Sequence, residues 1–452
     1  MNLLEFKDQL FAQGSEQGFT DMELYYEREE KFGCGLYKGE IDSYETSEVF
    51  GVSFRGLLDG KMGYAYTEKL DEESIVFLLE NAKENSHFIE DEEQEEIFPG
   101  SEKYEEGNFY SETLKEVSIA EKLDFLKEIE KHIYAYDERV DGTDYFIFNS
   151  AETERAILNN KGLSLNEKQN YLGMYISVVV KQGDEIKTGV YSKFTQDFQS
   201  LNPADIAKHA VEEALSQLGA KSVESKDYRV LLRHDAAGSL LNTFSPIFSA
   251  ESTQKGQSLL KDKVGEEISV PFLQIVDDPT LSEGLLSRTF DSEGVATSKQ
   301  DIVKDGKLVT LLHNRKTAKK DKTESTGHAY KSSYKSTLEV APTNLFIQPA
   351  EKSYDDLIAG VEEGIIITEL SGLHSGANTV SGDFSVAANG FYIKGGKVET
   401  PVKQMTIAGN FYELLKNVEE VGSDLEFAMS FVAPGYIGSP SLVIKELSVT
   451  VD

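Results

Sequence analysis

The histidines of this sequence are too far apart to form a local metal-binding motif. The closest two, His313 and His328, are fifteen residues apart, whereas two ligands on one helix face must be three or four residues apart. The H-E-x-x-H helix of zinc peptidases is therefore excluded. Zinc could be held only by residues distant in sequence, for example by His313, His328 and His374 with a carboxylate. Histidines scattered over a polar surface are the commoner alternative.

Other residues that could supply a nucleophile or a cluster ligand are also scarce. Cys34 is the only cysteine, so a disulfide within the chain and a cysteine-based zinc or iron–sulfur cluster are excluded. Cys34 lies in KFGCGLYKG, a mixed and glycine-rich setting that offers a thiolate little support, and we interpret it as structural. The G-x-S-x-G, P-loop and dinucleotide-binding patterns do not occur.

The segment from residue 369 to residue 390 is a candidate binding site. Its sequence, ELSGLHSGANTVSGDFSVAANG, alternates glycines with small and polar residues, so that backbone could approach a ligand or partner closely. A pair of tight turns whose polar side chains bond the local backbone is the alternative. The candidate peptide- or partner-binding residues are His374, Ser375, Asn378, Ser381 and Asp383.

A second candidate region spans residues 291–329. Its basic stretch from Arg315 to Lys322 is unusual in so acidic a chain. A mobile loop that holds an acidic or carboxylate-bearing substrate is one interpretation, and a solvated loop is the other. His313, Arg315 and His328 are the weaker candidate residues in this region.

Composition narrows the classes of protein that are possible. The 452 residues predict two or three domains, and 39% apolar residues are enough for real cores. Asp and Glu number 79 against 45 Lys and Arg, which gives a net charge of −34. That charge disfavours contact with nucleic acid or an anionic membrane. The sequence also lacks a secretory leader pattern and an apolar run long enough to span a membrane, so we expect a cytoplasmic protein.

Hydrophobic periodicity predicts an α+β fold built from antiparallel sheets with segregated helices. In the first half we predict strands beginning near residues 22, 48, 61, 144, 155 and 173, and helices over residues 71–86, 116–136 and 203–219. Residues 90–107 form an acidic run, either a solvated loop or an interaction tail. A polar segment near residue 222 predicts an N-terminal α+β domain over residues 1–222 and a β-rich C-terminal domain over residues 223–452.

Long collinear stretches of the sequence resemble the TldD/PmbA family. In the second half these are VLLRHDAAGSLL from Val230, FDSEGVATSKQDIVKDGKLVTLLHN from Phe290, STGHA from Ser325, and GIIITELSGLHSGANTVSGDFSVAANGFYIKGGKVETPVKQMTIAGNF from Gly364. LEFAMSFVAPGYIGSPSLVIKELSV near the C-terminus and YYEREEKFGCGLYKGEIDSYETSEVFGVSFRG near the N-terminus are similar to the same family. The resemblance covers nearly the whole chain and implies the family's fold.

The resemblance also implies a function, because the family has two kinds of subunit. A TldD-like subunit carries an H-E-x-x-x-H helix and binds the zinc of a metallopeptidase, and a PmbA/TldE-like subunit lacks those ligands and pairs with it. Here the positions of that motif are filled by Asn242, Thr243 and Ile247, and Pro246 would interrupt the helix. His234 and Asp235 stand a few residues too early.

We therefore expect a PmbA/TldE-like subunit with no catalytic residue and no metal of its own. The resemblance implies zinc in a TldD-like partner and unstructured peptides as substrates. The segment around His374 matches the part of the family fold near the peptide groove. Two alternatives stay open: a self-sufficient metallopeptidase whose metal is bound by His313, His328 and His374, and a peptide-binding homodimer without turnover.

Overall fold

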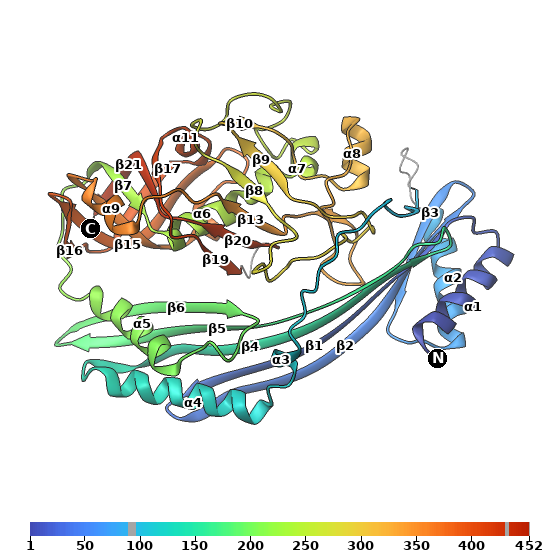
Figure 1. Cartoon of the computed structure of the whole chain (residues 1–452), viewed down its shortest axis with the longest axis horizontal. Helices are drawn as coiled ribbons and strands as arrows, with labels where there is room; N and C mark the ends of the chain where they lie inside the picture. Colours follow the sequence, from blue (N-terminus) through green and yellow to red (C-terminus); the bar gives the residue numbers. More distant parts are fainter. Residues whose placement is uncertain (89–95, 430–433, 452) are drawn as a thin grey trace.

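The computed structural model describes residues 1–88, 96–429 and 434–451. A long curved sheet forms one layer, and the second half of the chain lies over one of its faces (Figure 1). The sheet has the order β3-β2-β1-β4-β5-β6, and every neighbouring pair is antiparallel. Its strands are β1 (Met22–Tyr37), β2 (Glu40–Leu58), β3 (Lys61–Thr67), β4 (Val140–Asn159), β5 (Ser164–Gln182) and β6 (Glu185–Thr195).

Helices cover this sheet at both ends of one face. Side chains alternate between the faces of a strand, and even-numbered β1 residues pack on helices at both ends, Leu24 at one and Phe32 at the other. The first end carries α1 (Leu3–Glu16) and α2 (Glu72–Ser86), and the second carries α3 (Glu112–Lys115), α4 (Ile119–Tyr136) and α5 (Pro203–Ser216). The odd-numbered Tyr25 instead packs with Phe290 and Tyr334 of the second half.

The second half contains two larger sheets and a central helix. One sheet has the order β10-β9-β8-β13-β20-β19, and the other has the order β14-β7-β21-β17-β15-β16 with β18 paired to β21. Two of their pairings are parallel, β13 with β20 and β7 with β14. Helix α6 (His234–Phe244) packs against strands of both sheets and lies within the largest apolar core.

The strands of these sheets, and a short ladder formed by β11 and β12, are β7 (Lys226–Leu232), β8 (Ile275–Asp277), β9 (Gln300–Lys304), β10 (Lys307–Leu308), β11 (Ala329–Tyr330), β12 (Glu339–Val340), β13 (Asn344–Ile347), β14 (Glu363–Ser371), β15 (Asp383–Lys394), β16 (Lys397–Pro401), β17 (Met405–Asn410), β18 (Val418–Val421), β19 (Glu426–Met429), β20 (Tyr436–Ser439) and β21 (Leu442–Val451). The remaining helices are the 3₁₀ helix η1 (Ser245–Phe248), α7 (Ala250–Gln254), α8 (Arg315–Asp321), α9 (Tyr354–Ala359), α10 (Leu373–Gly376) and α11 (Phe411–Lys416).

The α+β class and the antiparallel sheets are confirmed. Two predictions on elements are wrong. The strands near residues 144 and 155 form one continuous strand, β4, and the basic stretch from Arg315 is a helix rather than a loop. Residues 90–95 of the acidic run lie outside the described residues, and the division at residue 222 stays a prediction. Among the described residues, no helix is long and apolar enough to cross a membrane.

Candidate functional site

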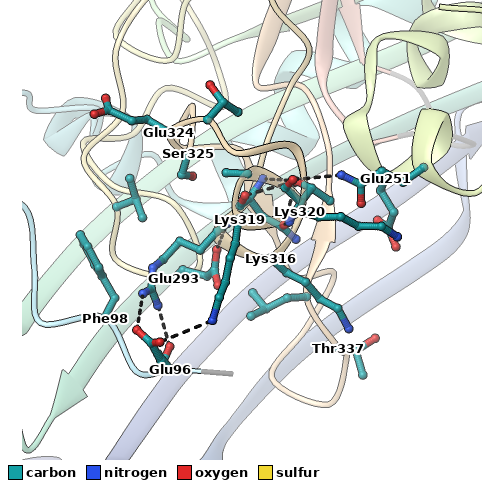
Figure 2. A pocket seen from close by; sticks show the side chains of 18 of the residues that line it. Glu96, Phe98, Glu251, Glu293, Lys316, Lys319, Lys320, Glu324, Ser325 and Thr337 are labelled. Atoms are coloured by element: carbon teal, nitrogen blue, oxygen red, sulfur yellow. Dashed lines mark hydrogen bonds and ion pairs between the residues drawn. The ribbon is translucent and has the colours of Figure 1, made fainter. Parts of the chain in front are cut away.

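A cavity of about 830 Å³ lies where the first sheet meets the second half of the chain. Its volume falls within the range of roughly 300–1,000 Å³ that is usual for ligand pockets. Strands β2 and β3, the segment after residue 95, and helices α7 and α8 all contribute side chains. Figure 2 labels those of α7, α8 and the segment after residue 95. Its charged lining residues are Arg55, Glu96, Glu251, Lys255, Glu293, Arg315, Lys316, Lys319, Lys320 and Glu324.

Helix α8 forms the basic wall of this cavity. A capping box starts the helix: the Asn314 side chain accepts a hydrogen bond from the Thr317 backbone, and the Thr317 hydroxyl bonds back to Asn314. This cap satisfies backbone donors that a short helix would otherwise leave open. Thr317 and Ala318 are the buried residues of this helix. The basic side chains that line the cavity are Arg315, Lys316, Lys319 and Lys320.

The segment after residue 95 packs against this basic wall. Ile97 is fully buried and anchors it, while Glu96 and Phe98 on either side line the cavity. The Glu96 carboxylate lies 3.5 Å from Lys319 Nζ and 4.0 Å from Arg315 Nη2. Arg315 also donates a 2.6 Å hydrogen bond to the Glu96 carbonyl and lies 4.9 Å from the centre of the Phe98 ring. Figure 2 shows Glu96 beside Lys319, with Phe98 nearby.

A buried acid, Glu293, forms part of the cavity wall, and a second, Asp291, lies beside it. Glu293 lines it and is 5% exposed, and its carboxylate accepts a 2.8 Å hydrogen bond from the Arg315 backbone. The adjacent Asp291 accepts backbone hydrogen bonds from Glu293, Val295 and Ala329. Burial, and then repulsion by Asp291, raise the pKa of Glu293 to about 7. Glu293 can therefore exchange a proton near neutral pH.

Two buried cations, Arg55 from the first half of the chain and Lys331 from the second, lie near each other at this junction. Arg55 of β2 is 5% exposed and lies 2.7 Å from Glu23 through Nε, while its buried Nη2 has no hydrogen-bond partner. Lys331 donates a 2.9 Å hydrogen bond to the Ser53 hydroxyl and lies 4.6 Å from the centre of the Tyr25 ring. Burial, and then the nearby Arg55, lower the pKa of Lys331 to about 8. The interface between the two halves is thus strongly ionic.

Two of the three histidines named from the sequence are buried neighbours. Backbone hydrogen bonds join His313 to the segment that contains His328. His328 Nε2 lies 3.1 Å from Asp277 Oδ1, and both residues are fully buried. Burial lowers the pKa of His313. The third histidine, His374, lies on the exposed helix α10, and within the described ranges no three His, Cys, Asp or Glu side chains are placed to hold a metal ion.

The polar side chains of the segment around His374 bond to one another. Asn378 accepts hydrogen bonds from the backbone of Val380 and Ser381, and Ser381 donates one to Asp383. Hydrogen bonds from Asn410 and Ser381 lower the pKa of Asp383. These contacts have the form of tight turns, and peptide or partner binding by His374, Ser375, Asn378, Ser381 and Asp383 stays a prediction. None of the five lines the cavity described above.

Cys34 of β1 is 2% exposed and packs in the apolar core beneath α4 and α5. Burial raises the pKa of its thiol. A thiol held in this way is a poor nucleophile and a poor metal ligand.

Comparisons with known proteins identify the class to which this fold and sequence belong. Three domain models of one family match the chain: PmbA/TldA metallopeptidase domain 1 at residues 22–86, the central domain at residues 112–218, and the C-terminal domain at residues 225–451. The chain therefore belongs to the PmbA/TldD metallopeptidase family. The family resemblance noted in the sequence is confirmed.

Individual relatives match from about two thirds to nearly all of this chain. An uncharacterized protein of Methanocaldococcus jannaschii is 30% identical over 97% of this chain and 98% of its own length. Metalloprotease PmbA of Escherichia coli O157:H7 is 28% identical over 69% of this chain and 67% of its own length. A crystal structure of a Thermotoga maritima protein, described as a modulator of a DNA gyrase, superposes with a TM-score of 0.91 and is 32% identical in sequence. The match covers 99% of this chain and 100% of that chain.

Sequence reasoning found the basic wall of the cavity but missed the buried charges in it and beside it. Arg315 was named as a candidate, and it does line the cavity. The sequence does not single out Glu293, Arg55 or Lys331. The sequence around Glu293 is typical of a turn, that around Arg55 of a strand, and that around Lys331 of a loop. For the basic wall, the sequence does contain one usable signal. Asn314 stands three residues before Thr317, and this spacing predicts the start of a helix at α8 and not a loop.

Proposed function

We propose that this chain is a PmbA/TldE-like subunit of a cytoplasmic metallopeptidase system that acts on unstructured peptides. In this proposal the chain has no catalytic zinc of its own. A TldD-like partner subunit supplies the zinc and the peptide-cleaving chemistry, and this chain helps to hold and position the substrate. It makes no contact with nucleic acid or membrane.

The observation that carries the proposal is the set of side chains on helix α6. The side chains at the expected metal positions, Asn242 and Thr243, do not fit a zinc ion, because neither offers a thiolate, imidazole or carboxylate. The helix also ends at Phe244 and continues as a 3₁₀ turn through Pro246. This ending supports the proposal, because a zinc-binding helix would have to continue past Phe244 to reach the position of the second histidine.

The two metal-capable residues at the start of α6 pair with neighbouring side chains. His234 Nδ1 lies 3.3 Å from Asp424 Oδ2, and Arg233 makes hydrogen bonds of 2.5 to 3.0 Å to the Asp235 carboxylate. Burial alone would lower the pKa of His234, but the hydrogen bond with Asp424 outweighs it and the pKa is raised. The Asp424 carboxylate thus stabilises the charged form of the ring, whereas zinc binds the neutral form.

A zinc-free subunit can still hold an extended peptide or a partner by strand addition. In the described part of the chain, β3 pairs only with residues 52–58 of β2. The first twelve residues of β2 therefore have β1 on one side and no strand on the other. Strand edges of this kind offer backbone donors and acceptors to a segment of another chain.

Metal analysis of the purified chain tests the proposal. The chain is incubated with one equivalent of zinc, desalted, and assayed for bound zinc and for cleavage of a fluorogenic unstructured peptide, with and without EDTA. We expect neither retained zinc nor cleavage. One zinc per chain, with cleavage that EDTA abolishes, would contradict the proposal, and loss of that zinc in the exposed-residue variant His374→Ala would favour the alternative site formed by distant histidines.

A further inference from the structure

The cavity between the two halves is lined by more cationic than acidic side chains, although the chain as a whole is strongly acidic. Six cationic side chains line it against four acidic ones, although acidic residues outnumber basic ones by 34 overall. Four of the six come from the first two turns of α8, namely Arg315, Lys316, Lys319 and Lys320. A local reversal of charge at a concave surface attracts ligands of the opposite sign.

The structure already contains one carboxylate bound to this wall. Glu96 lies against Lys319 and Arg315, and it comes from a segment far away in the sequence. Its side chain and that of Lys319 are each about 60% exposed. Exposed ion pairs of this kind are weak, so a ligand that brings its own carboxylates can displace Glu96.

One buried hydrogen-bond donor of the cavity lining, Nη2 of Arg55, has no acceptor. Arg55 lines the cavity, is nine-tenths buried or more, and has a buried Nη2 without a hydrogen-bond partner. An unpartnered guanidinium donor in a buried position is costly unless an acceptor arrives. A carboxylate oxygen that enters past the α8 wall would satisfy it.

The spacing of the basic residues suits an extended chain. Lys316 and Lys320, like Arg315 and Lys319, stand four residues apart on α8, which places each pair about 5–6 Å apart. Alternate side chains of an extended peptide are about 6.6 Å apart on one face. Acidic residues at alternate positions of such a peptide can therefore meet successive turns of α8, with Phe98 beside them as an apolar surface (Figure 2).

We infer that this cavity binds unstructured peptides with acidic residues at alternate positions, through the basic wall of α8 and Arg55. This inference rests on the proposed function in that it names the substrate class, but the site lies on this chain alone. Glu96 acts as an internal competitor, because it occupies the same two cations that the ligand needs. Nucleic acid does not fit the site, since the overall charge of −34 repels a long phosphate backbone.

Binding of a labelled peptide to the full-length chain tests this inference without zinc or a partner. The probe is a fluorescein-labelled peptide of alternating Glu and Thr, and the control probe has Gln in place of Glu. Fluorescence anisotropy is measured at physiological ionic strength, where charges more than about 8 Å away are largely screened. We expect saturable binding of the Glu probe and at least about fivefold weaker binding of the Gln probe.

Variants then assign the binding to the cavity. Lys319→Gln with Lys320→Gln should weaken binding of the Glu probe about fivefold or more, whereas the charge-matched control Lys261→Gln with Lys263→Gln, outside the cavity lining, should not. Glu96→Gln should strengthen binding about two- to fivefold, because it removes the internal carboxylate. The gain in the Glu96 variant cannot arise from misfolding.

Three results would overturn the inference. The first is equal affinity for the Glu and Gln probes, and the second is equal weakening by the α8 and control variants. The third is displacement of the probe by an equal concentration of inorganic phosphate, since the cavity would then be a site for small anions. Each of these outcomes leaves the proposed function intact, because zinc content and cleavage are measured separately.

Discussion

Burial decides the chemistry of the charged residues at the junction of the two halves. Glu293 and Lys331 are less than a tenth exposed, and their pKa values shift to about 7 and about 8 from ordinary values of 4.5 and 10.5. Both shifts favour the neutral form, as loss of solvation requires. Their positions could not be predicted from the sequence, because a Glu in DSEGVA and a Lys in AYKSS look like surface residues until the tertiary contacts bury them.

Replacing Glu293 by Gln should change how stability depends on pH. The folded pKa of Glu293 is raised above its unfolded value, so the proton it holds stabilises the fold below pH 4.5, and that stabilisation is lost as the pH rises towards 7. Gln keeps an acceptor for the Arg315 backbone and does not titrate. The variant should gain on the order of 2–3 kcal/mol over the native chain between pH 4.5 and pH 8.

Urea denaturation of both proteins at several pH values measures this difference. The native free energy of unfolding contains contributions from many groups, but the difference between the two proteins isolates Glu293. A difference that stays constant from pH 4.5 to pH 8, or one that shrinks, would show that the carboxylate is not held in its neutral form.

At the scale of elements, hydrophobic patterns predicted helices better than long strands. The helix predicted over residues 203–219 is observed as Pro203–Ser216, and a Pro at its start and a Gly after its end supplied the signal. Strand β4 is twenty residues long, but its central stretch AETERA is polar because that part faces solvent or the second half of the chain. Alternation of apolar residues fails there, whereas backbone pairing continues.

Close contact between a strand and a helix makes Gly189 a sensitive position. A Cβ at Gly189 of β6 would lie 2.1 Å from the backbone nitrogen of Ala214 in α5. Gly189→Ala should therefore force α5 away from the sheet and lower the free energy of unfolding by about 1–3 kcal/mol. Chemical denaturation measures the loss, and an unchanged midpoint would contradict the observed packing.

Gly238 of α6 provides the matched control. A Cβ there would have its nearest contact at 3.9 Å, from the backbone nitrogen of Ser439, so space is available. Alanine is favoured over glycine inside a helix, and Gly238→Ala should raise the free energy of unfolding by about 0.5–1 kcal/mol. The same substitution thus has opposite signs at two positions, and only packing distinguishes them.

At the scale of the whole molecule, the second half of the chain rests on the odd-numbered face of the first sheet (Figure 1). Tyr334 makes this contact directly: its ring covers Gly51 of β2, and its hydroxyl donates a 2.7 Å hydrogen bond to Glu68. The family resemblance predicted the fold but not this junction, because no periodic pattern marks a face that is polar, ionic and buried only by tertiary contact.

Adding a methyl group at Gly51 should loosen the junction. The new Cβ would lie 2.2 Å from the Tyr334 ring, so Gly51→Ala should destabilise the protein by about 1–3 kcal/mol. In the double variant with Tyr334→Ala the clash disappears, and the cost of Gly51→Ala should fall to near zero. Thermal denaturation of the four proteins gives the coupling, and additive effects would mean that the ring does not cover Gly51.

The central claim is that this chain works as the zinc-free half of a two-subunit peptidase. A tagged copy expressed in its native cells, purified gently and analysed by quantitative mass spectrometry, tests it most directly. The proposal predicts one TldD-like subunit bearing H-E-x-x-x-H for each copy of this chain, with zinc in the complex. Recovery of the chain only as a self-associated species with one bound zinc per copy would contradict it.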